Sequence, residues 1–110
     1  VPKGNPDKLK QYASVTYGTY PIDLATWNSD HYETIHGGYD TAAVNKDPQR
    51  LVPYTAALTL KAQGKIGDIA PYFLSTCGIG TNINPAKDIG SRMAQQLKAD
   101  GVGAVFLDSA

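Results

Sequence analysis

The polar side chains best suited to chemistry flank two adjacent glycines, in the stretch His36-Gly-Gly-Tyr-Asp40. Glycine tolerates positive φ and lets other groups approach the backbone closely, so Gly37 and Gly38 predict a tight turn that presents His36, Tyr39 and Asp40. A ligand-binding loop is one interpretation. The other is a structural turn, with a locally satisfied histidine and Asp40 capping the segment that follows. The residue types alone leave both open.

His31, Glu33 and His36 are also potential metal ligands. Their spacing, H-x-E-x-x-H, differs from the H-E-x-x-H of metalloproteases, whose histidines lie four residues apart on one helix face. Gly37 and Gly38 would in addition interrupt such a helix. We therefore expect no metal site in this stretch.

A second loop, Ser75-Thr-Cys-Gly-Ile-Gly-Thr-Asn82, is small and rich in hydroxyl groups. Gly78-x-Gly80 ahead of a predicted helix is similar to a phosphate-binding turn. However, the full G-x-G-x-x-G pattern and the lysine of a P-loop are both missing. Cys77 is a candidate nucleophile, although lone cysteines are commonly inert and partly buried, and the sequence identifies no base near it.

The composition excludes several classes of protein. The 110 residues carry a formal net charge of +0 without a Lys/Arg cluster, so we expect neither nucleic acid nor an anionic membrane as partner. No apolar stretch approaches the ~20 residues of a membrane-spanning helix. A single cysteine cannot form an internal disulfide, which fits a reducing cytoplasm. At this length the chain holds one domain at most.

The carboxyl-terminal third predicts a helix followed by a strand. Asn84-Pro85 indicates a helix start, Ile89, Met93 and Leu97 would share one face, and Gly101 would end it. The apolar run 102–107 then predicts a strand buried on both faces, as in a parallel sheet covered by helices. Ligands of such sheets bind beyond the carboxyl ends of the strands, which is where Asp108 and Ser109 would lie.

Three further elements are predicted. A short strand lies within 14–20, a helix starts at Pro53 and ends at Gly64, and a strand in 69–74 ends at Ser75-Thr76. We expect a core-packing stripe on the helix, from Leu51, Thr55, Leu58 and Ala62. The predicted fold class is α/β: a partial, open, mainly parallel sheet with flanking helices, a fragment of a larger domain. Residues 1–50 would be loop-rich and 51–110 the α/β core.

Five stretches in register resemble one family, the selenoprotein component B of the glycine, sarcosine and betaine reductases. They are Val1-Pro-Lys-Gly-Asn-Pro-Asp7, His36-Gly-Gly-Tyr-Asp40, Asn45-Lys-Asp-Pro-Gln-Arg50, Ser75-Thr-Cys-Gly-Ile-Gly-Thr81 and Leu97-Lys-Ala-Asp-Gly-Val102. D-proline reductase is a more distant relative. The resemblance covers essentially the whole chain.

The resemblance implies a reductase function. In that family, component B binds the amino acid or methylated amine, a selenolate attacks the α-carbon, and ammonia or an amine leaves. The carboxymethyl group then passes to selenoprotein A. A selenol is far more acidic than a thiol of pKa ~8.5, so it is ionised and nucleophilic at neutral pH. The selenocysteine would follow Ala110, so we expect no catalytic nucleophile within this chain and no turnover by the chain alone.

The resemblance also implies substrate-contacting residues, carried over position by position. Those in the first loop are His36, Gly37, Gly38, Tyr39 and Asp40; those in the second are Thr76, Gly78, Gly80 and Thr81. The family often has a small residue at the position of Cys77 and an asparagine at that of Ile79, so the identity of the substrate stays open. Relatives tend to carry an acidic residue where His31 stands, which weakens a metal site further.

Three interpretations therefore remain. The first is part of a reductase component B that ends before its selenocysteine, either because UGA was taken as a stop codon or by design. Its expected partners are an amino-acid or methylated-amine substrate, the other subunits of component B, and selenoprotein A. The second is a non-enzymatic α/β binding module with His36–Asp40 as its ligand loop. The third is a thiol enzyme that uses Cys77. Exposed sheet edges at the two ends of the chain would favour self-association as an artefact.

Overall fold

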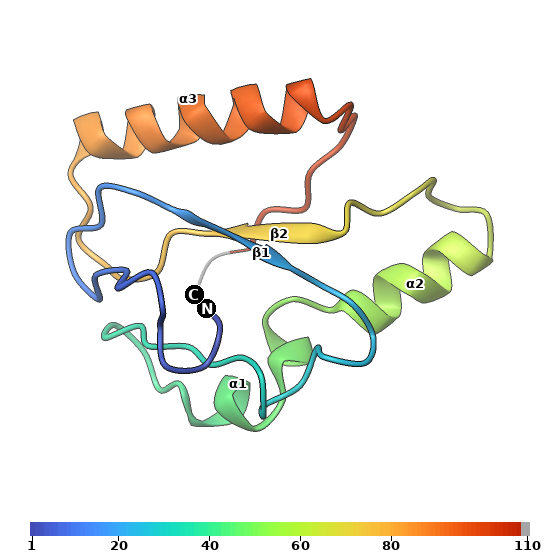
Figure 1. Ribbon diagram of the computed structural model, residues 1–110, viewed down its shortest axis with the longest axis horizontal. Helices are drawn as coiled ribbons and strands as arrows, with labels where there is room; N and C mark the ends of the chain where they lie inside the picture. The colour runs from blue at the N-terminus through green and yellow to red at the C-terminus, as the bar shows by residue number, and fades with distance from the viewer. Residues whose placement is uncertain (109–110) are drawn as a thin grey trace.

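The computed structural model describes residues 1–108, which form a mixed α/β fold around a small sheet (Figure 1). The elements in chain order are β1 (Gly18–Pro21), α1 (Ala42–Lys46), the 3₁₀ turn η1 (Pro48–Arg50), α2 (Tyr54–Ala62), β2 (Tyr72–Ser75) and α3 (Ile83–Ala99). The strands β1 and β2 and the helices α2 and α3 all lie close to the positions that the sequence predicts. Most of the first fifty residues lie outside helices and strands.

Strands β1 and β2 pair antiparallel, with Gly18 opposite Ser75 and Tyr20 opposite Phe73. Gly18 and Tyr20 lie two residues apart on the same face of β1. The phenol ring of Tyr20 folds back over Gly18. A Cβ at position 18 would overlap the ring, so only glycine fits there. This is the arrangement in which an aromatic ring covers a strand glycine.

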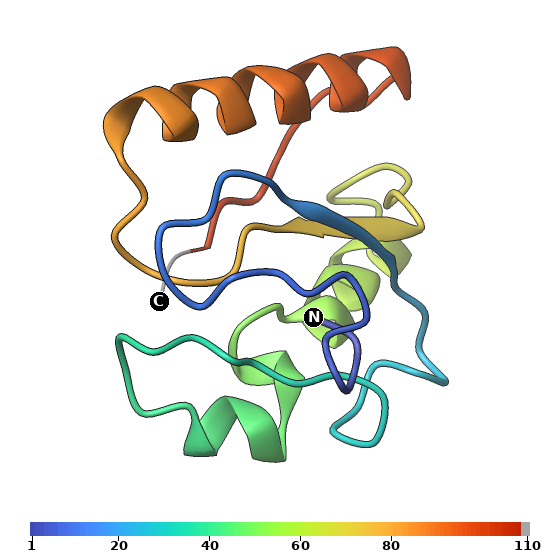
Figure 2. The same ribbon diagram turned by 60° about the vertical axis from the view of Figure 1, so that its left-hand side comes forward.

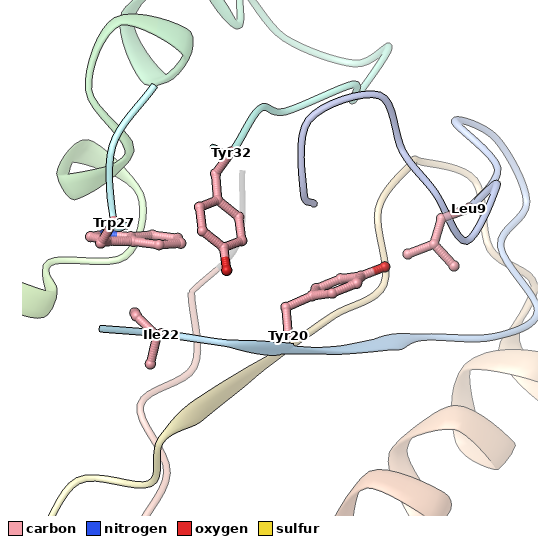
Figure 3. Close-up of a cluster of buried hydrophobic side chains, with 5 residues drawn as sticks. All are labelled: Leu9, Tyr20, Ile22, Trp27 and Tyr32. Atoms are coloured by element: carbon pink, nitrogen blue, oxygen red, sulfur yellow. The ribbon is translucent and has the colours of Figure 1, made fainter. Parts of the chain in front are cut away.

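An aromatic core covers the face of the sheet that points away from α3 (Figure 3). Its buried members are Leu9, Tyr20, Ile22, Trp27 and Tyr32, with Phe73 of β2 packed against them. The Phe73 ring centroid lies 5.1 Å from that of Trp27, 5.6 Å from Tyr20 and 5.7 Å from Tyr32, in tilted or edge-on geometry. Such pairs contribute about 0.5–1.5 kcal/mol each beyond the area that they bury. The loops on either side of β1 are therefore fixed to the sheet by rings.

Helix α3 lies along the other side of the strands (Figures 1 and 2). Ile89 is buried, and Met93 and Leu97 are half-buried on the same face, so the predicted stripe is confirmed. Polar contacts also hold the helix in place: Tyr17 Oη donates to Gln96 Oε1 at 2.9 Å, and Tyr72 Oη donates to Asp100 Oδ2 at 2.6 Å. Gln96 Nε2 also donates to Thr19 Oγ1 of β1 at 3.2 Å, so hydrogen bonds connect the helix and its C-cap residue, Asp100, to both strands.

The two ends of α3 agree to different degrees with the helix boundaries predicted from its capping residues. At the carboxyl end, Gly101 has φ +76°, its N–H donates to Lys98 O, and the N–H of Val102 donates to Leu97 O. This is a Schellman motif, as the glycine predicts. The helix begins two residues earlier than predicted, with Asn82 as N-cap. Pro85 still lies in the first turn, where its missing N–H has no partner to lose.

The predicted strand at 102–107 is wrong. Within the described residues this run forms no ladder, and Phe106 and Leu107 are 76% and 87% exposed. A strand needs a neighbour for its backbone N–H and C=O groups. Within the described residues, the backbone hydrogen bond of this run is the helix-capping bond from Val102 N–H to Leu97 O, and no strand pairs with it. Because the sheet of β1 and β2 is antiparallel, the prediction of a mainly parallel sheet is wrong as well. The mixed α/β class is confirmed.

The predicted core stripe on α2 is also wrong in part. None of the nine residues of α2 is buried. Leu51 and Leu58 are half-buried, whereas Thr55 and Ala62 are exposed.

No helix among residues 1–108 is long and apolar enough to cross a membrane.

Candidate functional site

Both predicted site loops border one broad concavity of about 1720 Å³. Its wall includes β2, the inner sides of α2 and α3, and the tail from Val102 to Asp108. His36 and Tyr39 line it from the first loop, Thr76 and Gly78 from the second, and Asp108 from the tail. Gly37, Gly38, Asp40, Gly80 and Thr81 do not line it. Ser109, the remaining predicted site residue, lies outside the described residues.

The two loops touch each other. The Cγ2 of Ile79 packs so tightly against Gly38 that a Cβ on the glycine would clash with it. Gly37 lies equally close to the phenol of Tyr12. Residues 36–40 and 76–81 therefore form one surface, and the paired glycines allow the close approach. Their role in substrate binding remains a prediction.

Residues 11–14 of the amino-terminal segment are hydrogen-bonded to the backbone of the second loop. The N–H of Ile79 donates to Gln11 O at 3.0 Å, and the N–H of Ala13 donates to Ile79 O at 2.7 Å. Ser14 Oγ is buried 2.6 Å from Cys77 O, 2.9 Å from Thr76 O and 3.0 Å from Lys10 O, so its one proton can donate to any of the three carbonyls. Sequence reasoning missed this segment, because no local pattern links residues about sixty positions apart.

His36 has a defined hydrogen-bonding state. Its Nδ1 accepts a hydrogen bond from the N–H of Gly38 at 2.9 Å, and its ring stacks at a tilt on Tyr39, with centroids 5.1 Å apart. A neutral imidazole that accepts at Nδ1 carries its proton on Nε2. Among residues 1–108, Nε2 has no hydrogen-bond partner. The half-buried ring therefore has one N–H donor that is available to a ligand.

The other members of the first loop make structural contacts. Asp40 Oδ1 accepts from the N–H of Ala42 at 2.9 Å, at the first residue of α1. Tyr39 Oη lies 3.3 Å from Thr34 Oγ1. These contacts fit a structural turn, in which Asp40 accepts from the residue two positions ahead as in an Asx-turn, while Thr41 is the N-cap of α1. They leave His36 as the member of this loop best able to bind a ligand.

Cys77 does not have the environment of an activated nucleophile. Its backbone has φ +53° and its side chain is half-buried against the aromatic core. Burial raises the pKa of the thiol, and the nearby Val1 amino group opposes that rise only in part. Catalytic cysteines need a lowered pKa, so the geometry argues against the thiol-enzyme interpretation.

The three potential metal ligands in this region have separate local partners. His31 Nδ1 lies 2.9 Å from Asn28 Oδ1, Glu33 Oε1 accepts from the N–H of Gly4, and His36 bonds to Gly38. Over residues 1–108, no three side chains of the metal-binding types come together in a way that could hold an ion.

Comparison with known proteins shows similarity to proteins named as subunits of reductase complexes. The family model "Glycine/sarcosine/betaine reductase selenoprotein B (GRDB)" matches residues 1–110. The sarcosine reductase complex component B subunit beta of Peptoclostridium acidaminophilum is 43% identical over 110 residues, which are 99% of this chain and 25% of that relative. The glycine reductase complex component B subunit gamma of Carboxydothermus hydrogenoformans is 41% identical over the same shares of each chain.

The chain therefore belongs to the glycine/sarcosine/betaine reductase selenoprotein B family, as its motifs predicted. The D-proline reductase subunit gamma of Acetoanaerobium sticklandii is a more distant relative, 38% identical over 66% of this chain and 30% of its own length. No solved structure matches. The chain spans about a quarter of the length of the component B subunits that it matches.

Proposed function

We propose that this chain is part of the substrate-binding component B of a reductase acting on glycine, sarcosine or betaine. The observation that carries the proposal is the family match over all 110 residues, with relatives named for each of the three substrates. The reaction is reductive cleavage of the bond between the α-carbon and nitrogen, and it releases ammonia or an amine. Other subunits of component B and selenoprotein A are the proposed partners.

The three substrates have a shared part and a variable part. Each is an acetate that carries nitrogen on its α-carbon, and they differ only in how many methyl groups the nitrogen holds. A site for this class therefore needs a group that holds the carboxylate and a region that fits the amine. We assign the carboxylate to the Nε2–H of His36, because the Gly38 N–H occupies Nδ1 and leaves Nε2 as a donor at the concavity. Hydrogen bonds to a charged acceptor are the stronger kind.

The nucleophile in this proposal lies outside residues 1–110. A selenocysteine placed after Ala110 would supply a selenolate that displaces the amine from the α-carbon. The described tail runs from the end of α3 back toward the sheet (Figures 1 and 2), and Asp108 lines the same concavity as His36. This course supports a nucleophile that enters from the end of the tail.

Reading the coding sequence beyond the Ala110 codon tests this placement. We expect TGA, followed by an open frame that begins Gly-Thr-Cys. A cysteine codon in place of TGA would make the enzyme a thiol variant. A true stop with no coding frame beyond it would overturn the reductase proposal for this chain and favour the binding module.

A further inference from the structure

One large apolar surface of the described chain has no other described segment packed against it. It lies on the wall of the concavity and is formed by α2, the segment after α2, and the tail; we call it the uncovered face. Its most prominent members are Ala57, Leu60, Ile66, Val105, Phe106 and Leu107. Leu60 is 39% exposed, and Phe106 and Leu107 are far more so. The buried core residues Ile22, Trp27 and Tyr32 line another part of the same concavity, and of α2 only Tyr54, its first residue, packs against that core.

The local structure requires something to pack on this surface. Helix α2 has nine residues and no buried side chain. Isolated helices shorter than ~12–15 residues are marginal in water, so most of the stability of such a helix comes from packing its apolar face. Contiguous exposed apolar patches of this kind mark interfaces. Beside this surface, Lys61 Nζ pairs with Asp68 Oδ1 at 3.0 Å, and Asp108 borders it at the end of the tail.

We propose that the uncovered face is an internal interface, occupied by an apolar segment of the same full-length polypeptide outside residues 1–110. The relatives carry the matched segment within chains about four times as long, since the match covers 25% of each. A tethered segment acts at a high effective concentration and binds without the cost of bringing two molecules together. Permanent interfaces are also more apolar than transient ones, and this surface is apolar. The inference is independent of the substrate.

Thiol labelling of the full-length protein tests the proposal. Leu60→Cys and Phe106→Cys place a reporter on the uncovered face. Leu24→Cys is the matched control, because Leu24 is an apolar residue, 65% exposed, that does not line the concavity. Labelling is read at each introduced cysteine by peptide mass spectrometry, so that native residues do not interfere. We expect positions 60 and 106 to react at least about tenfold more slowly than position 24, because local opening must precede reaction.

The labelling experiment also distinguishes an unoccupied face, a second copy of the chain and another subunit from the proposed internal segment. Equal rates at the three positions overturn the proposal. Protection that disappears on dilution identifies a second copy of the chain and overturns it as well. Protection that appears only when other subunits are added assigns the face to them, with the same consequence.

Hydrogen exchange of the unmodified full-length protein covers the case in which a cysteine variant fails to fold. We expect the backbone amides of α2 to be protected to a similar degree as those of α3. Exchange of the α2 amides at the rate of an open loop would contradict an internal interface.

Discussion

The N–H of Gly38 donates a hydrogen bond to Nδ1 of His36 at 2.9 Å, which fixes the tautomer of the one histidine that lines the concavity. The neutral ring then carries its proton on Nε2. That N–H is the basis for assigning the substrate carboxylate to His36. The turn that the paired glycines allow therefore determines which ring nitrogen of His36 is the proposed carboxylate donor.

Replacing His36 with phenylalanine in the full-length protein should remove the carboxylate donor and keep a ring on Tyr39. We expect glycine to bind about 10- to 100-fold more weakly, as the loss of a hydrogen bond to a charged group implies. Binding of glycinamide, which lacks the carboxylate, should change little. Calorimetric titration of both ligands measures the difference.

His31→Phe is the matched control for that variant, because His31 is exposed and bonds to Asn28. It should leave the preference for glycine over glycinamide intact. If His36→Phe weakens both ligands equally, His36 has only a structural role. A wild-type protein that binds none of the three amino acids would instead refute the proposed function.

Two buried tyrosines should respond in opposite ways to loss of the hydroxyl group. Tyr20 Oη is buried and makes no hydrogen bond of good geometry among residues 1–108, although burial and the nearby Asp7 carboxylate raise its pKa, whereas Tyr32 Oη donates to Pro21 O at 2.5 Å. Tyr20→Phe should leave the stability unchanged or raise it, and Tyr32→Phe should lower it by about 0.5–1.5 kcal/mol. Denaturant unfolding compares the two variants. A larger loss for Tyr20→Phe would show that its hydroxyl has a partner after all.

The two glycines Gly38 and Gly90 form a second matched pair. A Cβ at Gly38 would clash with Ile79 and come within 2.7 Å of the His36 ring, whereas Gly90 faces open space in the middle of α3. Gly38→Ala should therefore destabilise by about 1–3 kcal/mol, through forced displacement of its neighbours. Gly90→Ala should stabilise by up to about 1 kcal/mol, because alanine is the better helix former. Equal effects in thermal unfolding would mean that the two loops do not touch.

Sequence reasoning succeeds where the signals are local. The periodicity of Ile89, Met93 and Leu97 and the glycine at 101 predict α3, because capping and packing of one helix need no distant partner. It fails at 102–107, since a strand is defined by a neighbour that apolar residues alone do not identify. The contact between Gly38 and Ile79 could not be predicted either, because it joins two loops that are far apart in the sequence. The paired glycines pointed to the first loop, the end of the predicted strand to Asp108 and Ser109, and the family motifs to the residues of the second loop. The structure adds the tautomer of His36.

Cys77 should react slowly with alkylating agents at neutral pH, because burial raises the pKa of its thiol. The native protein keeps the thiol protonated at pH values where the unfolded chain has already lost the proton. Stability from this group is therefore full below the unfolded pKa and falls as the pH rises toward the native pKa. Mass spectrometry of the Cys77 peptide against pH checks the rate. Rapid alkylation at pH 7 would revive the thiol-enzyme interpretation.

Amine release by the full-length protein, combined with the other components of the complex and a dithiol donor, tests the central claim most directly. Glycine should release ammonia, sarcosine methylamine or betaine trimethylamine, and residues 1–110 alone should release none. The absence of amine from all three substrates would contradict the proposed function. Release by residues 1–110 alone would contradict a nucleophile placed beyond Ala110.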